Sequence, residues 1–132
     1  YKLTRSQGFG KEVQRRIMCG TFVLSAGYYD AYYSKAQKVR RMVAEKTRQT
    51  LETADFIICP TAPTPAYKIG AVSDPITSFL GDIFTVQANI AGIPAISLPL
   101  YKTKNNLPIG IQLMTARWQE EKMLAFSNAL MQ

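Results

Sequence analysis

The residue types in this sequence exclude most of the common catalytic sites. The chain has no histidine, which removes Ser-His-Asp and Cys-His catalysis and histidine-based zinc sites. Its two cysteines, Cys19 and Cys59, are too few to close a zinc site. Ser34 and Lys35 are adjacent, and adjacent residues on a helix do not face each other. Since the carboxylates are few and scattered, the residues alone predict no catalytic constellation and no metal site.

Cofactor-binding motifs are missing as well. The sequence holds no Walker phosphate loop and no G-x-S-x-G elbow, and its one Gly-x-Gly, residues 8–10, lacks the third glycine of a dinucleotide-binding turn. We therefore expect no cofactor to be bound by this chain itself.

Positive charge is concentrated in the first part of the chain. Residues 1–50 contain 11 Lys and Arg against 3 acidic residues, whereas residues 51–132 contain 5 against 6. Such asymmetry is typical of a surface for an anionic partner such as RNA, and equally of a solvated helix face.

Two helices are expected to carry this charge, at about residues 11–26 and 28–53. Apolar residues recur along each at the spacing of one helical face. Gly20 lies on the apolar stripe of the first helix and predicts the close approach of another element. Gly27 is a suitable residue to end that helix.

Short apolar runs predict three buried strands, at residues 55–59, 95–98 and 108–114. Three prolines within residues 60–65 predict a rigid, extended connector after the first strand. Three short strands do not easily make a self-sufficient sheet, so we expect them to belong to a larger one.

Two further helices are predicted. The first runs from the Asp74-Pro75 start signal to about residue 91, and a Gly-x-Pro sequence follows it. In such a continuous helix, Asp82 and Asn89 would project in nearly the same direction. The second covers about residues 120–131 as an amphipathic helix.

The composition indicates a globular protein. Of 132 residues, 47% are hydrophobic and 19% charged, and no apolar run is long enough to cross a membrane. Both cysteines have apolar neighbours, which predicts buried, reduced thiols and a cytoplasmic location. The start at Tyr1 favours a segment of a longer protein.

Four strings in order carry a family resemblance. Residues 55–70 (DFIICPTAPTPAYKIG), 81–100 (GDIFTVQANIAGIPAISLPL) and 107–114 (LPIGIQLM) resemble the C-terminal part of amidase-signature enzymes. Residues 8–43, which begin GFGKEVQRRIM, form a more specific string that resembles the A-subunit family of tRNA-dependent amidotransferases. The resemblance extends over about residues 6–130.

The resemblance implies an α/β fold. Residues 1–132 would form a single segment, the C-terminal portion of a mixed β-sheet core covered by helices, and would be incomplete alone. It also implies a glutamine-hydrolysing A subunit whose ammonia passes to a B subunit. That B subunit uses ATP and magnesium to convert misacylated Glu-tRNA(Gln) or Asp-tRNA(Asn), and is the main contact for the tRNA. A C subunit joins the other two, the complex is cytoplasmic, and no membrane is involved.

The resemblance also assigns site residues. The family's nucleophilic serine, second serine and lysine lie in an upstream signature, and this sequence has no Gly-Ser-Ser-Gly run. No catalytic residue is therefore expected here, and the segment alone should be inactive. By the resemblance, Arg16 holds the α-carboxylate of glutamine and Asp82 its α-ammonium group. Arg15 competes for the first role, but on a helix it lies about 160° from Val13 on the apolar stripe, against about 60° for Arg16.

Two other functions stay open at this point. One is a different amidase-signature hydrolase that acts on small amides, against which the string at residues 8–43 argues. The other is a stand-alone basic module that binds tRNA or another partner.

Overall fold

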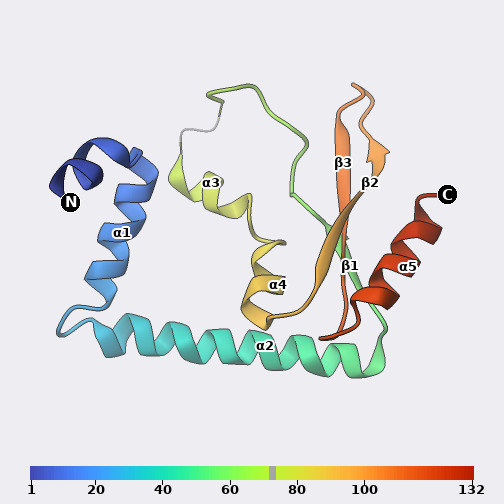
Figure 1. The fold of residues 1–132 in the computed structure, drawn as a ribbon, viewed down its shortest axis with the longest axis horizontal. Coiled ribbons are helices and arrows are strands. Elements are labelled where there is room, and N and C mark those ends of the chain that lie inside the picture. The colour runs from blue at the N-terminus through green and yellow to red at the C-terminus, as the bar shows by residue number, and fades with distance from the viewer. Residues whose placement is uncertain (72–73) are drawn as a thin grey trace. The chain divides into compact units, whose positions relative to one another are not determined.

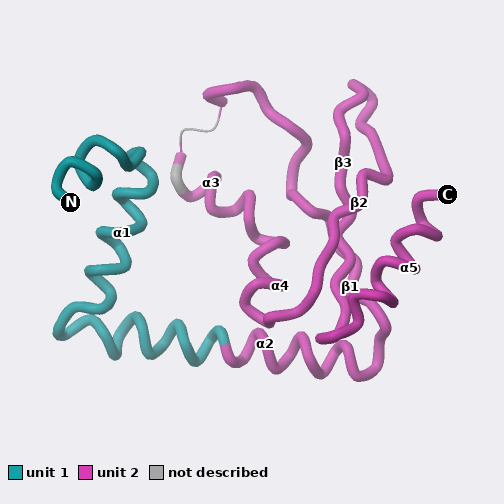
Figure 2. The backbone as a smooth tube through the Cα atoms, viewed as in Figure 1, with its two compact units in different colours: residues 1–40 teal, residues 41–132 magenta. Residues whose placement is uncertain are grey.

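The computed structural model describes residues 1–71 and 74–132, which divide into two compact units (Figure 2). The first unit is residues 1–40 and the second is residues 41–132. The long helix α2 (Lys35–Thr53) begins in the first unit and ends in the second.

The first unit is helical. It contains the π-helical turns η1 (Thr4–Gly8) and η2 (Tyr29–Ser34), on either side of α1 (Lys11–Val23). The predicted break between the two long helices is confirmed, but α1 ends at Val23, earlier than the expected end near residue 26. Gly27 lies in the turn that follows, with a φ of 84°, a left-handed conformation that favours glycine.

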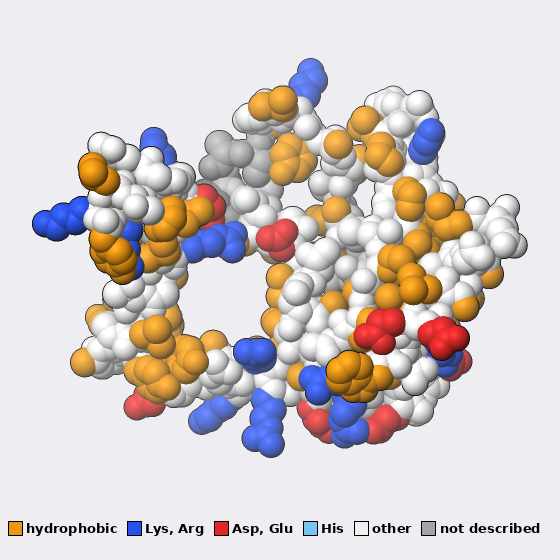
Figure 3. Space-filling model, in the orientation of Figure 1, with side chains coloured by type: hydrophobic (Ala, Val, Ile, Leu, Met, Phe, Trp, Pro, Cys, Tyr) orange, Lys and Arg blue, Asp and Glu red, His pale blue; other side chains and the backbone are white. Residues whose placement is uncertain are grey.

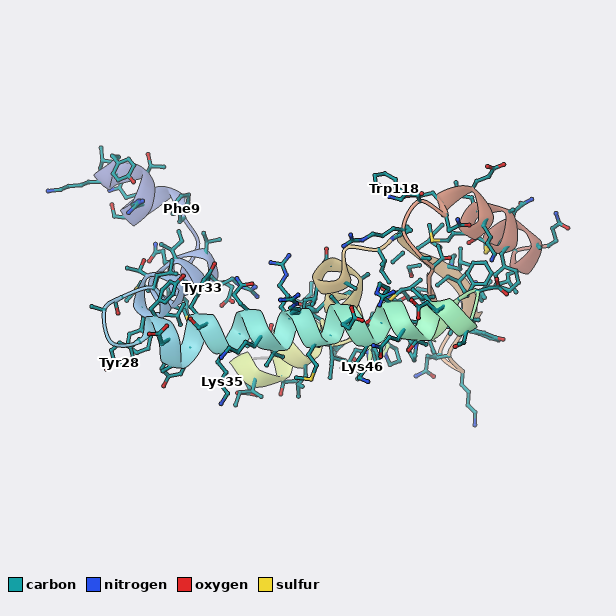
Figure 4. The ribbon with its side chains drawn as sticks, turned by 90° about the horizontal axis from the view of Figure 1, so that it is seen from below. Phe9, Tyr28, Tyr33, Lys35, Lys46 and Trp118 are labelled. Atoms are coloured by element: carbon teal, nitrogen blue, oxygen red, sulfur yellow. The ribbon has the colours of Figure 1, made fainter. Side chains whose placement is uncertain are left out.

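Little of this unit is buried. No residue of α1 or of either π-helical turn is buried, and hydrophobic side chains reach the surface over α1 and η2 (Figure 3). The aromatic rings of Phe22, Tyr28 and Tyr32 contact one another, with centroids 4.3 Å apart for Phe22 and Tyr28. Tyr28 lies in the turn between α1 and η2 (Figure 4).

Two expectations for α1 were wrong in this structure. Apart from the backbone of α1 itself, no atom of residues 1–40 lies within 4 Å of the position that a Cβ on Gly20 would take, so no other element of this unit approaches the glycine closely. Cys19 is exposed, not buried, although both cysteines are free thiols as expected. Within residues 1–40 no residue of α1 is buried, and Ile17 on the apolar stripe is exposed as well.

The second unit is built on a three-stranded sheet (Figure 1). Its strands are β1 (Ile57–Pro60), β2 (Ala95–Lys102) and β3 (Pro108–Met114), which confirms the three predicted strands within a few residues. The order is β1-β3-β2 and both pairings are antiparallel, so β3 is central. Helix α5 (Glu120–Leu130) packs on β2 and β3.

The core of this unit lies on β3 and its neighbours. Leu113 and Met114 are fully buried in β3, Leu98 is buried in β2, and Met123 is buried in α5. The apolar runs that predicted the strands therefore supply the core.

Strand β2 is longer than expected. The sequence predicted its end before Pro99, but pairing resumes at Tyr101 after a register shift between Leu98 and Tyr101. A proline has no N–H for a ladder, and a bulge in an edge strand accommodates it.

The predicted helix at residues 74–91 is two short helices. These are α3 (Pro75–Leu80) and α4 (Val86–Ala91), separated by turns at residues 81–85. The signals at both ends are confirmed: Asp74 accepts a hydrogen bond from the Thr77 N–H, and Gly92 ends α4 with a φ of 64°. The prediction of one continuous helix was wrong. The break begins at Gly81, and glycine is a poor helix former.

Candidate functional site

Arg16 lies on α1, in the first unit. Its guanidinium donates from Nε to Oε1 of Glu12 at 3.0 Å, while Arg15 donates from Nη1 to Oε2 of the same carboxylate at 3.1 Å. Glu12 precedes each arginine by about one helical turn, the spacing at which side chains on a helix surface meet. The two arginines therefore share one anion, and a substrate carboxylate at either would compete with Glu12.

Burial does not separate the two arginines. The side chain of Arg16 is 59% exposed and that of Arg15 is 57% exposed. A hollow on α1 lies beside Arg15, Met18 and Phe22. The sequence argument that favours Arg16 stays a prediction.

Asp82 lies in the turns between α3 and α4, in the second unit, and is exposed. Its main-chain carbonyl accepts hydrogen bonds from the N–H of Thr85 at 3.1 Å and of Val86 at 3.0 Å. Because the predicted helix is broken here, the expected alignment of Asp82 with Asn89 on one continuous helix was wrong. Asp82 instead precedes the first turn of α4.

Three polar side chains hold the turns at residues 81–85 and the helix α4 that follows them. Gln112 of β3 donates from Nε2 to the Phe84 carbonyl at 3.0 Å. Gln87 of α4 donates to the hydroxyl of Thr47 on α2 at 3.1 Å. Arg117 donates to the carbonyls of Ala91 at 3.1 Å and Gly92 at 2.9 Å, at the C-terminal end of α4.

Sequence reasoning missed Gln112 and Arg117. A cation at the C-terminus of a helix is favourable, but Arg117 is 25 residues from Gly92 in the chain and no local pattern joins them. The polar residue inside the apolar run of β3 was the one available signal for Gln112. Beyond Arg117, Trp118 projects from the connection to α5 and is 88% exposed (Figure 4).

One face of the sheet carries a small polar cluster. Gln112 pairs with Cys59 on β1 and with Ser97 on β2, and directly paired residues point to the same face. On this face the hydroxyls of Thr61 and Ser97 lie 2.6 Å apart above Gly110. A Cβ on Gly110 would lie 2.6 Å from the Ser97 Oγ, so a larger residue there would displace these hydroxyls.

The thiol on this face is shielded. Burial raises the pKa of Cys59 above its ordinary value, and a weak hydrogen bond from Gln112 opposes the shift only in part. A raised pKa leaves less thiolate at neutral pH, so this geometry does not create a nucleophile.

Neither a metal cluster nor a membrane span occurs in the described part of the chain. Residues 1–71 and 74–132 hold no group of three or more acidic, cysteine or histidine side chains that could bind a metal ion. No helix in the same ranges is long and apolar enough to span a bilayer.

The fold and the segments described above match a known family. The family model described as Amidase matches residues 1–124, nearly the whole chain. The chain belongs to the amidase family.

Two of the similar curated proteins are A subunits of glutamyl-tRNA(Gln) amidotransferases. The A subunit of the glutamyl-tRNA(Gln) amidotransferase of Psychrobacter sp. (strain PRwf-1) is 52% identical over 132 residues, which is 100% of this chain and 26% of that protein. The subunit of the same name from Acinetobacter baumannii (strain AYE) is 53% identical over 100% of this chain and 27% of that protein. The chain thus spans about a quarter of the length of these relatives.

Solved structures of amidase-family proteins have the same fold. The A subunit of the glutamyl-tRNA(Gln) amidotransferase of Thermotoga maritima is 51% identical, with a TM-score of 0.69, over 92% of this chain and 26% of that chain. The 6-aminohexanoate cyclic dimer hydrolase complexed with substrate has a TM-score of 0.74 at 22% identity, over 95% and 28% of the two chains. These matches confirm the predicted α/β fold as a portion of an amidase domain. The assignment of residues 1–132 to one domain, and the roles of Arg16 and Asp82, stay predictions.

Proposed function

We propose that this chain is part of the glutamine-hydrolysing A subunit of a tRNA-dependent amidotransferase. The observation that carries the proposal is the identity of 51–53% with A subunits over all or nearly all of the chain, against 22% for the hydrolase of the cyclic dimer. The similarity to the cyclic dimer hydrolase supports the fold alone. The similarity to the A subunits includes the basic segment at residues 8–43.

The whole protein would release ammonia from glutamine. A partner B subunit would use ATP and magnesium to activate misacylated Glu-tRNA(Gln) or Asp-tRNA(Asn), and ammonia would complete the amidation. A C subunit would join the two, and the complex would act in the cytoplasm as a ligase. ATP, magnesium and most of the tRNA contact belong to the B subunit in this proposal, and none requires a site on the present chain.

The role of this chain is to bind glutamine. Free glutamine carries an α-carboxylate and an α-ammonium group, so a selective pocket needs a cation and an anion. Arg16 supplies a planar fork that suits a carboxylate, and Asp82 supplies the anion from an exposed turn. The serines and the lysine of the family's catalytic signature would come from the rest of the protein.

The first experiment replaces Arg16 by alanine in the full-length protein, assembled with its partners. Loss of one partner of a desolvated charge pair costs about 2–5 kcal/mol, so glutamine-dependent amidation should fall at least about 30-fold in kcat/KM. Amidation with added ammonium chloride should be unchanged, because ammonia bypasses the glutamine pocket.

Arg15→Ala is the matched control, because Arg15 shares Glu12 with Arg16 and is equally exposed. If Arg15→Ala abolishes glutamine use while Arg16→Ala does not, the two assignments are exchanged. A parallel fall of the glutamine and ammonia reactions would show a structural role for Arg16. A full-length protein that hydrolyses small amides and ignores glutamine would instead be another amidase-signature hydrolase, and one that binds tRNA without amidase activity would be a binding module.

A further inference from the structure

Gln112 is a buried amide in the middle of an apolar strand. Its neighbours Ile111, Leu113 and Met114 are apolar, yet Gln112 itself is only 4% exposed. Burial of an amide is unfavourable unless its hydrogen bonds are satisfied. A methionine of similar volume would fill the same space without this cost, so packing alone does not account for the amide.

The hydrogen bonds of Gln112 account for it. Its Nε2 donates to the Phe84 carbonyl at 3.0 Å and to the Cys59 sulfur at 3.6 Å. The first bond joins the central strand to the turns at residues 81–85, across 28 positions in the sequence. The bond to sulfur is the weaker one, so the Phe84 carbonyl is the main partner.

The turns at residues 81–85 are the segment that carries Asp82. They are neither helix nor strand, and their main-chain hydrogen bonds are local ones, from the N–H groups of Asp82, Ile83 and Thr85 to the carbonyls of Phe79, Leu80 and Asp82. Phe84 is two residues from Asp82, and Gln112 lines a hollow of about 440 Å³ with Thr85 and Asn89. A hydrogen bond from the rigid centre of the sheet therefore acts directly on the backbone beside the carboxylate.

We propose that Gln112 is a positioning residue for glutamine, because it fixes the backbone turn that presents the Asp82 carboxylate to the α-ammonium group. The proposal rests on the proposed function and deepens it. Local turn bonds hold these residues only to their near neighbours in the chain. Without a bond to the sheet, the carboxylate would have to be ordered by the substrate, and that cost weakens binding. The hydrogen bond from Gln112 orders the turn in the free protein, so glutamine binding need not supply the free energy of ordering it.

The test uses the full-length protein in its complex. Gln112→Met keeps the volume and removes the donor, and the KM for glutamine should rise about tenfold. Ammonia-dependent amidation should keep its wild-type kcat. Gln112→Glu places an acceptor against the Phe84 carbonyl at neutral pH, so its KM should rise further.

Leu113→Val is the control for a general loss of stability. Leu113 is the next residue of β3, is fully buried, and points to the opposite face of the sheet. This variant should lower Tm at least as much as Gln112→Met and leave the KM for glutamine unchanged. Equal effects of the two variants on KM, at equal loss of Tm, would overturn the proposal.

A double-mutant cycle with Asp82→Asn tests whether Gln112 acts through Asp82. Gln112→Met should raise KM about tenfold in the wild type and less than about twofold when Asp82 is already replaced. Full additivity would overturn the positioning role even if both single variants are impaired. If instead Asp82→Asn and Arg16→Ala both leave glutamine kinetics intact, it is the proposed glutamine pocket that fails.

Discussion

Cys59 and Cys19 show how the surroundings of a side chain decide its chemistry. Both have apolar neighbours in the sequence, but Cys19 is exposed on α1 and Cys59 is half-buried on the edge strand β1. Burial raises the pKa of the Cys59 thiol, so its reactive thiolate form is depleted at neutral pH.

We expect Cys59 to be alkylated slowly in the folded protein. In a Cys19→Ser background, iodoacetamide at pH 7.5 should modify Cys59 at least about fivefold more slowly than in urea. The difference should shrink as the pH rises and more thiolate forms. Mass spectrometry of the tryptic peptide over time measures the rate, and equal rates in buffer and urea would contradict the expectation.

At the scale of elements, α3 shows that a short helix depends on its cap. Asp74 accepts hydrogen bonds from the N–H and the hydroxyl of Thr77, both at 2.8 Å. These bonds, the main-chain one first, lower the pKa of Asp74 below its ordinary value. A helix of this length has few internal hydrogen bonds of its own, so the cap carries much of its order.

The start of α3 should therefore be sensitive to acid. Because the folded-state pKa of Asp74 is depressed, its stabilising effect is complete above the ordinary pKa and is lost as the pH falls through the lower folded value. Hydrogen exchange at the Thr77 N–H, corrected for the intrinsic rate, should lose protection over that range. In Asp74→Asn the protection should no longer depend on this titration, and an unchanged pH profile would show that another group is responsible.

At the scale of the whole molecule, much apolar surface is uncovered. Exposed hydrophobic residues occur on α1, on both edge strands and on α5, among them Ile17, Ile58, Tyr101 and Leu124 (Figure 3). A stable monomer rarely exposes so much apolar surface in contiguous patches. The edges of β1 and β2 also offer unpaired main-chain groups to other chains.

We expect the 132-residue segment, expressed alone, to associate or to unfold without a sharp transition. Size-exclusion chromatography with light scattering should show oligomers, and thermal melts should be broad. Expression within the full-length protein is the control and should restore a sharp melt. A monomer with a cooperative melt and protected amides in all three strands would contradict this expectation.

Local sequence signals determined many elements of this protein. The Asp74-Pro75 start, the Gly92 stop, the turn at Gly27 and the three apolar strands each depend on residues close together in the chain, and all were confirmed. The ordered strings at residues 8–43 and 81–100 also identified the family, which the family-model match confirmed.

Only the tertiary structure decided which distant residues meet. It joins Gln112 to Phe84, Thr61 to Ser97 and Arg117 to Gly92, pairs separated by 28, 36 and 25 positions. Cys19 is exposed, although its apolar neighbours in the sequence had predicted burial. The predicted helix at residues 74–91 is divided at residue 81, although its local pattern had predicted one continuous helix. The physical reason is that periodicity and caps act over a few residues, whereas burial and cross-chain hydrogen bonds depend on which elements the fold brings together.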